Sequence, residues 1–215
     1  MFYSYTKIDT PFKRDTEGSK KLIDNLFRDE TVEFLANCQW YGTEKVDGMN
    51  IGIVWDGHSV SYQGRTTKAQ LPNDLIKALD ELFMGNVNEE MFEQLFGEKT
   101  VILYGEGYGG KVQRGGRYRP DCSFILFDIY MPNENIWLKR EAIEEIAKTL
   151  NIDVVPILFT GSLYEAIEYI KSQPISKVAN NNQTVIEGIV CKPMIDLLDR
   201  RNKRIITKVK VCDFC

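Results

Sequence analysis

In the 215-residue chain, the segment around one lysine has the residue types best suited to catalyse a reaction. Lys45 is followed by Val46, Asp47 and Gly48, and the segment stands just before the apolar run 51–55. A lysine amine becomes a nucleophile once it has lost its proton, and nearby positive charge favours that loss. The tetrapeptide alone is weak evidence, because Asp-Gly pairs are common in surface turns. The rest of the sequence therefore decides between the two interpretations.

Four further segments carry glycines, carboxylates, lysines and an aromatic residue in a fixed order after this lysine. They are Gly105–Gly107, Phe124–Ile129, Glu187–Pro193 and Lys208–Lys210. The chain has a single histidine, His58. A histidine-rich metal site within one chain is therefore excluded, and a Ser-His-Asp triad is disfavoured. The available chemistry is that of amines, carboxylates and a metal ion bound through oxygen.

In their order and separations, these segments resemble the motifs of the covalent nucleotidyltransferases, which include the ATP-dependent polynucleotide ligases and the RNA capping enzymes. The resemblance narrows to RNA ligases of the phage and kinetoplastid-editing type. Four features match that narrower group: Glu44 before the lysine, Asn50, the segment 64–66 and the opening residues 1–5. Asn50 completes the pattern Lys-x-x-Gly-x-Asn. Met49 departs from the threonine expected in that group.

The resemblance implies an ATP-dependent RNA ligase that works in three steps. These are adenylylation of the enzyme, transfer of AMP to a 5′-phosphate, and sealing to a 3′-hydroxyl. Lys45 is the expected nucleophile toward the α-phosphorus of ATP, and Lys208 and Lys210 are expected to contact the α-phosphate. Glu187 is the expected metal ligand, and the hard cation would be Mg²⁺ or Mn²⁺.

The resemblance also implies roles for residues that bind the nucleotide. Glu106 is expected to bind the ribose, and Phe127 to stack on the adenine. Glu44 is expected to accept a hydrogen bond from the adenine amino group, which would favour ATP over GTP. Arg65 is expected to contact the sugar or phosphate and the RNA end. Asn50 is expected to contact the metal-bound waters or the strand end.

The overall charge at first argues against a nucleic-acid partner. The chain has 27 Lys+Arg and 31 Asp+Glu, and its formal net charge is −4. Basic residues nevertheless gather in two places, 111–119 and 200–204. Beside a nucleotide site such clusters suit phosphate backbones. We therefore expect Lys111, Arg114 and Arg117 to bind RNA.

The glycines at 105–110 match the dinucleotide-binding pattern GxGxxG, but the residues that follow are glycine-rich and not helical. A dinucleotide fold needs a helix N-terminus at that point. The stretch also matches GxxxxGK, but Val112 stands where a phosphate loop needs Ser or Thr. Both patterns are therefore rejected.

Hydrophobic periodicity predicts the elements that must position these residues. We expect strands at 51–55, 59–63, 101–104, 124–130, 184–191 and 204–211 and helices at 73–84, 139–150 and 162–171. Asn73 or Asp74 is expected to cap the first helix, and Gly85 to end it. The irregular order favours an α+β fold with antiparallel sheets flanked by helices over a regular βαβ repeat. The resemblance implies one nucleotidyltransferase (adenylation) domain over 1–215. The chain departs from the family in ending soon after Lys210, and we expect no appended OB-fold or C-terminal domain.

Several observations bear on compartment and partners. The chain has no apolar run of about 18 residues, which would be needed to cross a membrane, and its first 20 residues lack the apolar core of a secretory signal. Its five cysteines, which include a CxxC at 212–215, are expected to be reduced thiols in a cytoplasmic protein. The expected partners are RNA ends and a protein that replaces the missing C-terminal domain. The resemblance suggests a phage or bacterial source.

Three other functions stay open at this point. Two belong to the same superfamily: a small DNA ligase, and a capping enzyme that uses GTP. The third is a nucleotide-binding or RNA-binding module without activity. The presence of Lys45 argues against the third, because a silent protein has no chemical need for the nucleophile.

Overall fold

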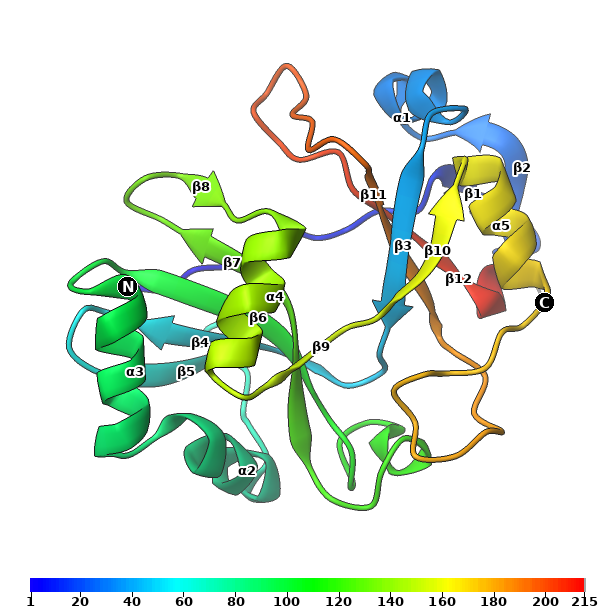
Figure 1. Ribbon diagram of the computed structural model, residues 1–215. Coiled ribbons are helices and arrows are strands. Elements are labelled where there is room, and N and C mark those ends of the chain that lie inside the picture. The colour runs from blue at the N-terminus through cyan, green and yellow to red at the C-terminus, as the bar shows by residue number, and fades with distance from the viewer. Residues whose placement is uncertain (215) are drawn as a thin grey trace. The chain divides into compact units, whose positions relative to one another are not determined.

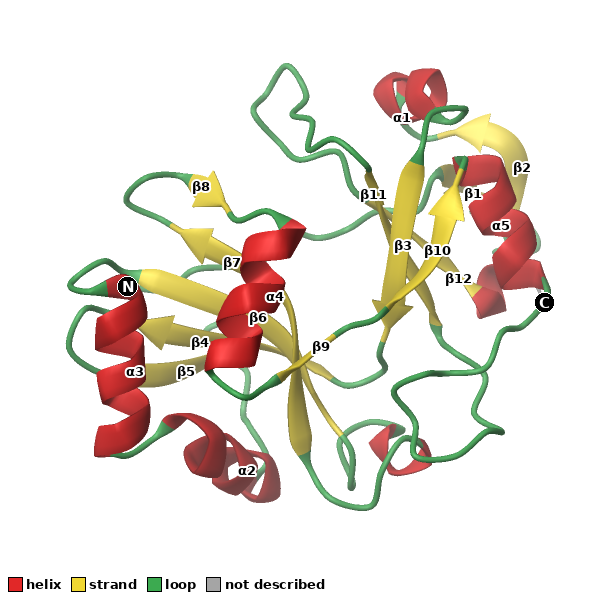
Figure 2. Ribbon diagram, in the orientation of Figure 1, coloured by secondary structure: helices red, strands yellow, loops and turns green. Residues whose placement is uncertain are grey.

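The computed structural model describes residues 1–214, which form two compact units. Unit 1 comprises Met1–Thr6 and Asp47–Val155, and unit 2 comprises Lys7–Val46 and the chain from Pro156 onward. Antiparallel sheets with helices packed against them confirm the predicted α+β class (Figure 2). The single domain predicted for 1–215 stays a prediction. Cys215, the last cysteine of the CxxC, lies outside the described residues.

The main sheet of unit 1 has the strand order β5-β4-β6-β7-β8, and β9 adds to β7 in parallel. Its strands are β4 (Met49–Trp55), β5 (Val60–Gly64), β6 (Val101–Tyr108), β7 (Ser123–Met131), β8 (Ile136–Trp137) and β9 (Asp153–Val154). Alternate residues of β4, Ile51, Ile53 and Trp55, point into the core, as a period of two requires. The predicted strands 51–55 and 59–63 correspond to β4 and β5, which pair antiparallel around Asp56.

Three helices contribute to the core of unit 1 (Figure 1). They are α2 (Asn73–Phe83), α3 (Asn86–Phe96) and α4 (Arg140–Thr149). The predicted capping of α2 was wrong, because Pro72 occupies the N-cap position and makes no side-chain cap hydrogen bond. Gly85 has φ +96 and precedes α3. A short turn of 3-10 helix, Gly115–Arg117, interrupts the glycine-rich loop after β6, so the rejected dinucleotide pattern does not open an α-helix.

Unit 2 is built on a four-stranded sheet with the order β10-β3-β11-β12. Its strands are β3 (Trp40–Lys45), β10 (Ile157–Gly161), β11 (Gly188–Pro193) and β12 (Thr207–Lys210). A separate hairpin pairs β1 (Phe12–Arg14) with β2 (Leu22–Phe27), and the helices are α1 (Glu30–Leu35) and α5 (Leu163–Lys171). The predicted strand 184–191 starts later than expected, because 184–187 precede the β11 ladder.

The core of unit 2 lies between one face of this sheet and α5. Ile189, Cys191 and Val209 are fully buried there, together with Ile167 and Ile170 of the helix. Ser162 caps α5 in a capping box with Glu165, which satisfies two backbone N–H groups at the helix start. The opposite face of the sheet carries Lys45, Lys208 and Lys210.

Within residues 1–214, no helix is long and apolar enough to cross a membrane. The four cysteines in that range are free thiols, as predicted.

Candidate functional site

Three strands of unit 2 place two of the predicted catalytic lysines in one row across the sheet. Gly188 of β11 is paired with Lys45 of β3 on one side and with Lys210 of β12 on the other. Because paired residues share a face of the sheet, the two amines flank a residue without a side chain. A Cβ on Gly188 would lie 2.2 Å from the carbonyl oxygen of Val209. A larger residue would therefore disturb the row.

Glu187, the residue just before β11, joins the two lysines. Its Oε2 lies 2.5 Å from Nζ of Lys45, and its Oε1 lies 2.5 Å from Nζ of Lys210. The three side chains are only 16 to 28 % exposed, so solvent screens these pairs less than pairs on the open surface. The sheet register and the one carboxylate thus form a compact cluster, which we call the lysine–carboxylate cluster (Lys45, Glu187 and Lys210).

The charges of the cluster shift the pKa values of Glu187 and Lys210. Burial by itself raises the pKa of the Glu187 carboxyl, but Lys45 and Lys210 outweigh that effect and hold the pKa below its ordinary value. For Lys210, burial alone lowers the pKa, and the bond and charge of Glu187 raise it by more. Each partner thus stabilises the charged form of the other.

Two more lysines share the polar face of this sheet. Val190 is paired with Lys208 on β12, and Lys192 follows two residues after Val190 on β11. Residues two apart on a strand point to the same face, so Lys192 and Lys208 lie on the face of the cluster. Both are half-buried. Lys192 was missing from the predicted site, although counting by twos from Gly188 would have placed it there.

Glu44 does not lie with Lys45. Neighbouring residues on a strand point to opposite faces, and the Glu44 side chain is buried, with the residue only 2 % exposed. Its carboxylate accepts hydrogen bonds from the Ser176 hydroxyl and, at 2.9 Å, from the backbone N–H of Lys177. Glu44 thus already has partners within unit 2, and its predicted adenine contact stays a prediction.

Asp47, in unit 1, is held by the glycine-rich loop after β6. Its backbone N–H donates to the Tyr118 hydroxyl over 3.2 Å, and its carboxylate lies 3.7 Å from Nη2 of Arg117. Arg117 also donates to the Tyr118 hydroxyl over 3.0 Å. Of the three residues predicted to bind RNA, Arg117 therefore has bonds within the protein, whereas Lys111 and Arg114 are exposed.

Two of the predicted nucleotide-binding residues of unit 1 lie side by side on one face of its sheet. Asn50 of β4 is paired directly with Glu106 of β6, and both are half-buried. Phe127 of β7 is half-buried as well. Arg65 directly follows β5 and is exposed. The core helices pack on the other face, which the side chain of Ile51 enters.

A divalent cation would have one carboxylate of the cluster to bind. Within residues 1–214, no group of three or more His, Cys, Asp or Glu side chains could hold a metal ion. Mg²⁺ keeps several waters and is typically held by one or two carboxylates together with substrate phosphates. Glu187 could supply one such carboxylate. A cation there would compete with Lys45 and Lys210 for the carboxylate oxygens.

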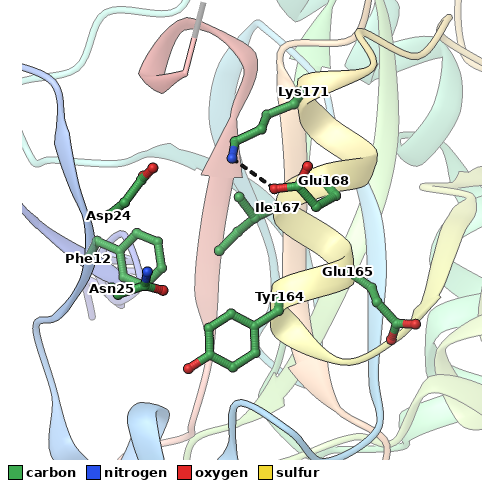
Figure 3. A pocket seen from close by; sticks show the side chains of 8 residues that line it. All are labelled: Phe12, Asp24, Asn25, Tyr164, Glu165, Ile167, Glu168 and Lys171. Carbon is green, nitrogen blue, oxygen red and sulfur yellow. Dashed lines mark hydrogen bonds and ion pairs between the residues drawn. The ribbon is translucent and has the colours of Figure 1, made fainter.

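A separate recess of 320 Å³ lies between β2 and α5 of unit 2. Figure 3 shows Tyr164, Glu168 and Lys171 of the helix around it, with Asp24 on the opposite side. Lys171 and Glu168 are bonded to each other over 2.8 Å. The members of the lysine–carboxylate cluster are not among the lining residues, so this recess is a different feature of unit 2.

Comparison with known proteins agrees with the motifs and the fold. Residues 39–210 match the family model described as RNA ligase. The Naegleria gruberi RNA ligase solved with PPi is similar in structure, with a TM-score of 0.64 and 20 % identity over 96 % of this chain and 61 % of that chain. A variant of it solved with ATP and Mn gives 0.64 and 19 % over 95 % and 60 %.

At this identity the structural match establishes a shared fold, and the chain spans about 60 % of the length of those structures. No curated protein sequence matches the chain. The family model, in contrast, covers most of the residues, including Lys45, Glu187 and Lys210. The chain therefore belongs to the RNA ligase family.

Proposed function

We propose that this chain is an ATP-dependent RNA ligase that forms a covalent lysyl-AMP on Lys45. The observation that carries the proposal is the lysine–carboxylate cluster, in which Lys45 and Lys210 share the carboxylate of Glu187. Structures with the same fold contain ATP and Mn, AMP and Mn, or PPi. ATP and pyrophosphate are the substrate and the by-product of the proposed first step, and AMP is the group that it transfers.

In that step the Lys45 amine attacks the α-phosphorus of ATP. A nitrogen–phosphorus bond forms, the bond from the α-phosphorus to the bridging oxygen breaks, and pyrophosphate leaves. The amine must lose its proton and its bond to Glu187 first, because an ammonium bonded to a carboxylate has no free electron pair. Lys208 and Lys210 would neutralise the negative charge that builds up on the phosphate oxygens.

Glu187 is the residue that would hold Mg²⁺ or Mn²⁺. A cation held there would supply positive charge to the triphosphate. A cation held by Glu187 would compete with the Lys45 amine for the carboxylate oxygens. Glu187 thus has two roles in the proposal: it holds the resting lysine, and it binds the cation.

We also propose a nucleotide contact for each of four residues of unit 1. Glu106 binds the ribose, Phe127 stacks on the adenine, Asn50 contacts the metal-bound waters or the strand end, and Arg65 contacts the phosphate or the RNA end. The cross-strand pair of Asn50 and Glu106 supports a shared role for these two residues. In unit 2, Glu44 keeps its proposed adenine contact.

We propose that exposed basic side chains of unit 1 contact the RNA. Lys111 and Arg114 are free to reach a phosphate backbone, and Arg117 contributes mainly by holding Asp47. RNA ends that carry a 5′-phosphate and a 3′-hydroxyl are the proposed substrates. A partner protein that supplies a C-terminal domain completes the proposal.

Labelling with α-³²P-ATP tests the first step. The wild type incubated with Mg²⁺ or Mn²⁺ should gain one covalently bound AMP, and Lys45→Ala should gain none. Lys171→Ala is the matched control, because it removes another ion-paired lysine of unit 2 and should label normally. An unlabelled wild type would contradict the proposal.

Two further assays on the wild-type protein distinguish the proposed ligase from two competing activities. Labelling by GTP in place of ATP would indicate a capping enzyme. Sealing of nicked duplexes with DNA rather than RNA at the 3′-hydroxyl side would indicate a DNA ligase. Sealing that needs RNA at this side supports the proposal.

A further inference from the structure

The first six residues belong to unit 1, although the chain enters unit 2 at Lys7. The backbone N–H of Tyr3 donates to Oε1 of Gln63 over 3.1 Å, and the Tyr3 carbonyl accepts from the Tyr104 hydroxyl over 2.9 Å. The side-chain amide of Gln63 donates to the same carbonyl. Two strands of the sheet, β5 and β6, therefore hold this N-terminal segment.

Tyr5 carries the segment into the sheet face that holds Phe127. Its hydroxyl donates to Oδ2 of Asp128 over 2.5 Å, and Asp128 is only 1 % exposed. The Tyr5 ring meets the Phe127 ring edge-on, with 5.1 Å between the centroids. It also packs against Tyr104 and Trp137 at 5.0 and 5.7 Å. One buried side chain thus bonds to Asp128 and touches its neighbour Phe127.

A β-bulge explains why Phe127 and Asp128 can both meet Tyr5. Strand β6 pairs Gly105 with Leu126 and Tyr104 with Asp128, so Phe127 stands between the two pairs as an extra residue. In a regular strand, neighbouring residues point to opposite faces, and a bulge cancels that alternation locally. Phe127 and Asp128 therefore lie on the same face.

The bulge places a carboxylate where water has little access. A buried carboxylate without a hydrogen-bond donor is costly, so the Tyr5 hydroxyl stabilises the bulged conformation. The edge-on ring contact restrains Phe127 as well. Phe127 remains half-buried and is thus not sealed into the core.

We propose that Tyr5 is a positioning residue that fixes Phe127 for stacking on the adenine of ATP, through its hydrogen bond to Asp128 and its ring contact. This inference rests on the proposed function, in which Phe127 binds the base. It assigns to the N-terminal segment a task in nucleotide recognition, and it places the chemistry elsewhere, on Lys45.

Tyr5→Phe keeps the ring and removes the hydroxyl. We expect the KM for ATP in adenylylation to rise about five- to tenfold, while kcat stays within about twofold. Tyr3→Phe is the matched control, because Tyr3 makes the contacts described above through its backbone. It should leave both constants unchanged. An unchanged KM in Tyr5→Phe would overturn the inference.

A double-mutant cycle with Phe127→Ala separates positioning from a general structural role. If Tyr5 acts through Phe127, adding Tyr5→Phe to Phe127→Ala should cause no further rise in KM. Multiplied effects would overturn the inference, as would a Phe127→Ala variant with the KM of the wild type. The proposed formation of lysyl-AMP on Lys45 would survive both results, because it is tested separately by labelling of the wild type and of Lys45→Ala.

Asp128→Asn provides a second route if Tyr5→Phe does not fold. The asparagine keeps the shape of the side chain and weakens the bond from the Tyr5 hydroxyl, because its carbonyl carries no full charge. We expect a rise in the KM for ATP in the same direction, again absent in the Phe127→Ala background. A rise that persists in that background would contradict the inference.

Discussion

The two units position their proposed site residues by different physical means. In unit 2, sheet register brings Lys45 and Lys210 to one carboxylate, and charge holds all three together at 2.5 Å. In unit 1, a bulge and a buried hydrogen bond set the orientation of Phe127. Charge suits the stabilisation of a reacting phosphate, whereas a fixed ring suits recognition of a neutral base. Changes in unit 2 should therefore affect kcat, and changes in unit 1 should affect KM.

Lys210→Ala should give the largest effect short of removing the nucleophile. The variant loses a cation that is proposed to stabilise charge on the α-phosphate, and we expect the single-turnover rate of adenylylation to fall by about 100- to 1,000-fold. Rapid-quench measurement of labelled protein at saturating ATP checks this. A rate within about threefold of the wild type would show that unit 2 does not act through charge.

Glu187→Gln should slow the same step and also change stability with pH. The depressed pKa of Glu187 means that its ion pairs contribute stability above the ordinary value of 4.5, and that this contribution is lost as the pH falls through the lower pKa. We expect the variant to be less stable by about 2 kcal/mol at pH 7.

Urea unfolding at pH 7 and near pH 3 tests the pH dependence. The difference between wild type and Glu187→Gln should shrink at the lower pH. Glu168→Gln, which breaks an exposed pair with Lys171, is the matched control and should cost little at either pH. Equal differences at both pH values would contradict the assigned pKa direction.

Phe127→Ala tests unit 1, where the expected change is in the KM for ATP. Loss of the stacking surface should raise the KM for ATP about tenfold and leave kcat nearly unchanged. Phe127→Tyr keeps the ring and should behave as the wild type. Steady-state adenylylation across ATP concentrations gives both constants. A fall in kcat without a change in KM would show that the two units do not divide the work in this way.

The smallest expected effect concerns the exposed cations of unit 1. Replacing Lys111 and Arg114 together by alanine should weaken RNA binding several-fold and reduce the salt dependence by about two phosphate contacts. Adenylylation without RNA should not change. RNA titrations at several salt concentrations check this. An unchanged salt slope would show that these side chains do not contact the phosphate backbone.

The motifs named the three residues of the lysine–carboxylate cluster, but they did not predict that Glu187 pairs with both lysines. Lys45, Glu187 and Lys210 all occur in the motifs, but the pairing of β3, β11 and β12, together with alternation along each strand, was needed to place Lys45 and Lys210 on one face. The same alternation separates Glu44 from Lys45, which the motif alone does not show. Lys192 was missed although the same alternation, counted from Gly188, places it on the face of the cluster.

The face of unit 1 was harder to predict, because a bulge changes the pattern that sequence analysis relies on. Alternation puts Phe127 and Asp128 on opposite faces, whereas the structure puts them on one. Tyr5 and Asp128 are 123 residues apart, and no local pattern connects them. Strand β3 was missed for a related reason, since its residues, Trp40–Lys45, are nearly all buried and show no alternation.

Gly188 has a consequence for how anions reach the cluster. Because this residue has no side chain, one carboxylate can serve as a counter-ion to amines on both neighbouring strands. In the resting protein Glu187 thus occupies the role of a phosphate, as an internal mimic of the substrate's charge. An incoming triphosphate then exchanges one anion for another and does not enter an unbalanced positive field, so simple anions such as sulfate should be weak competitors.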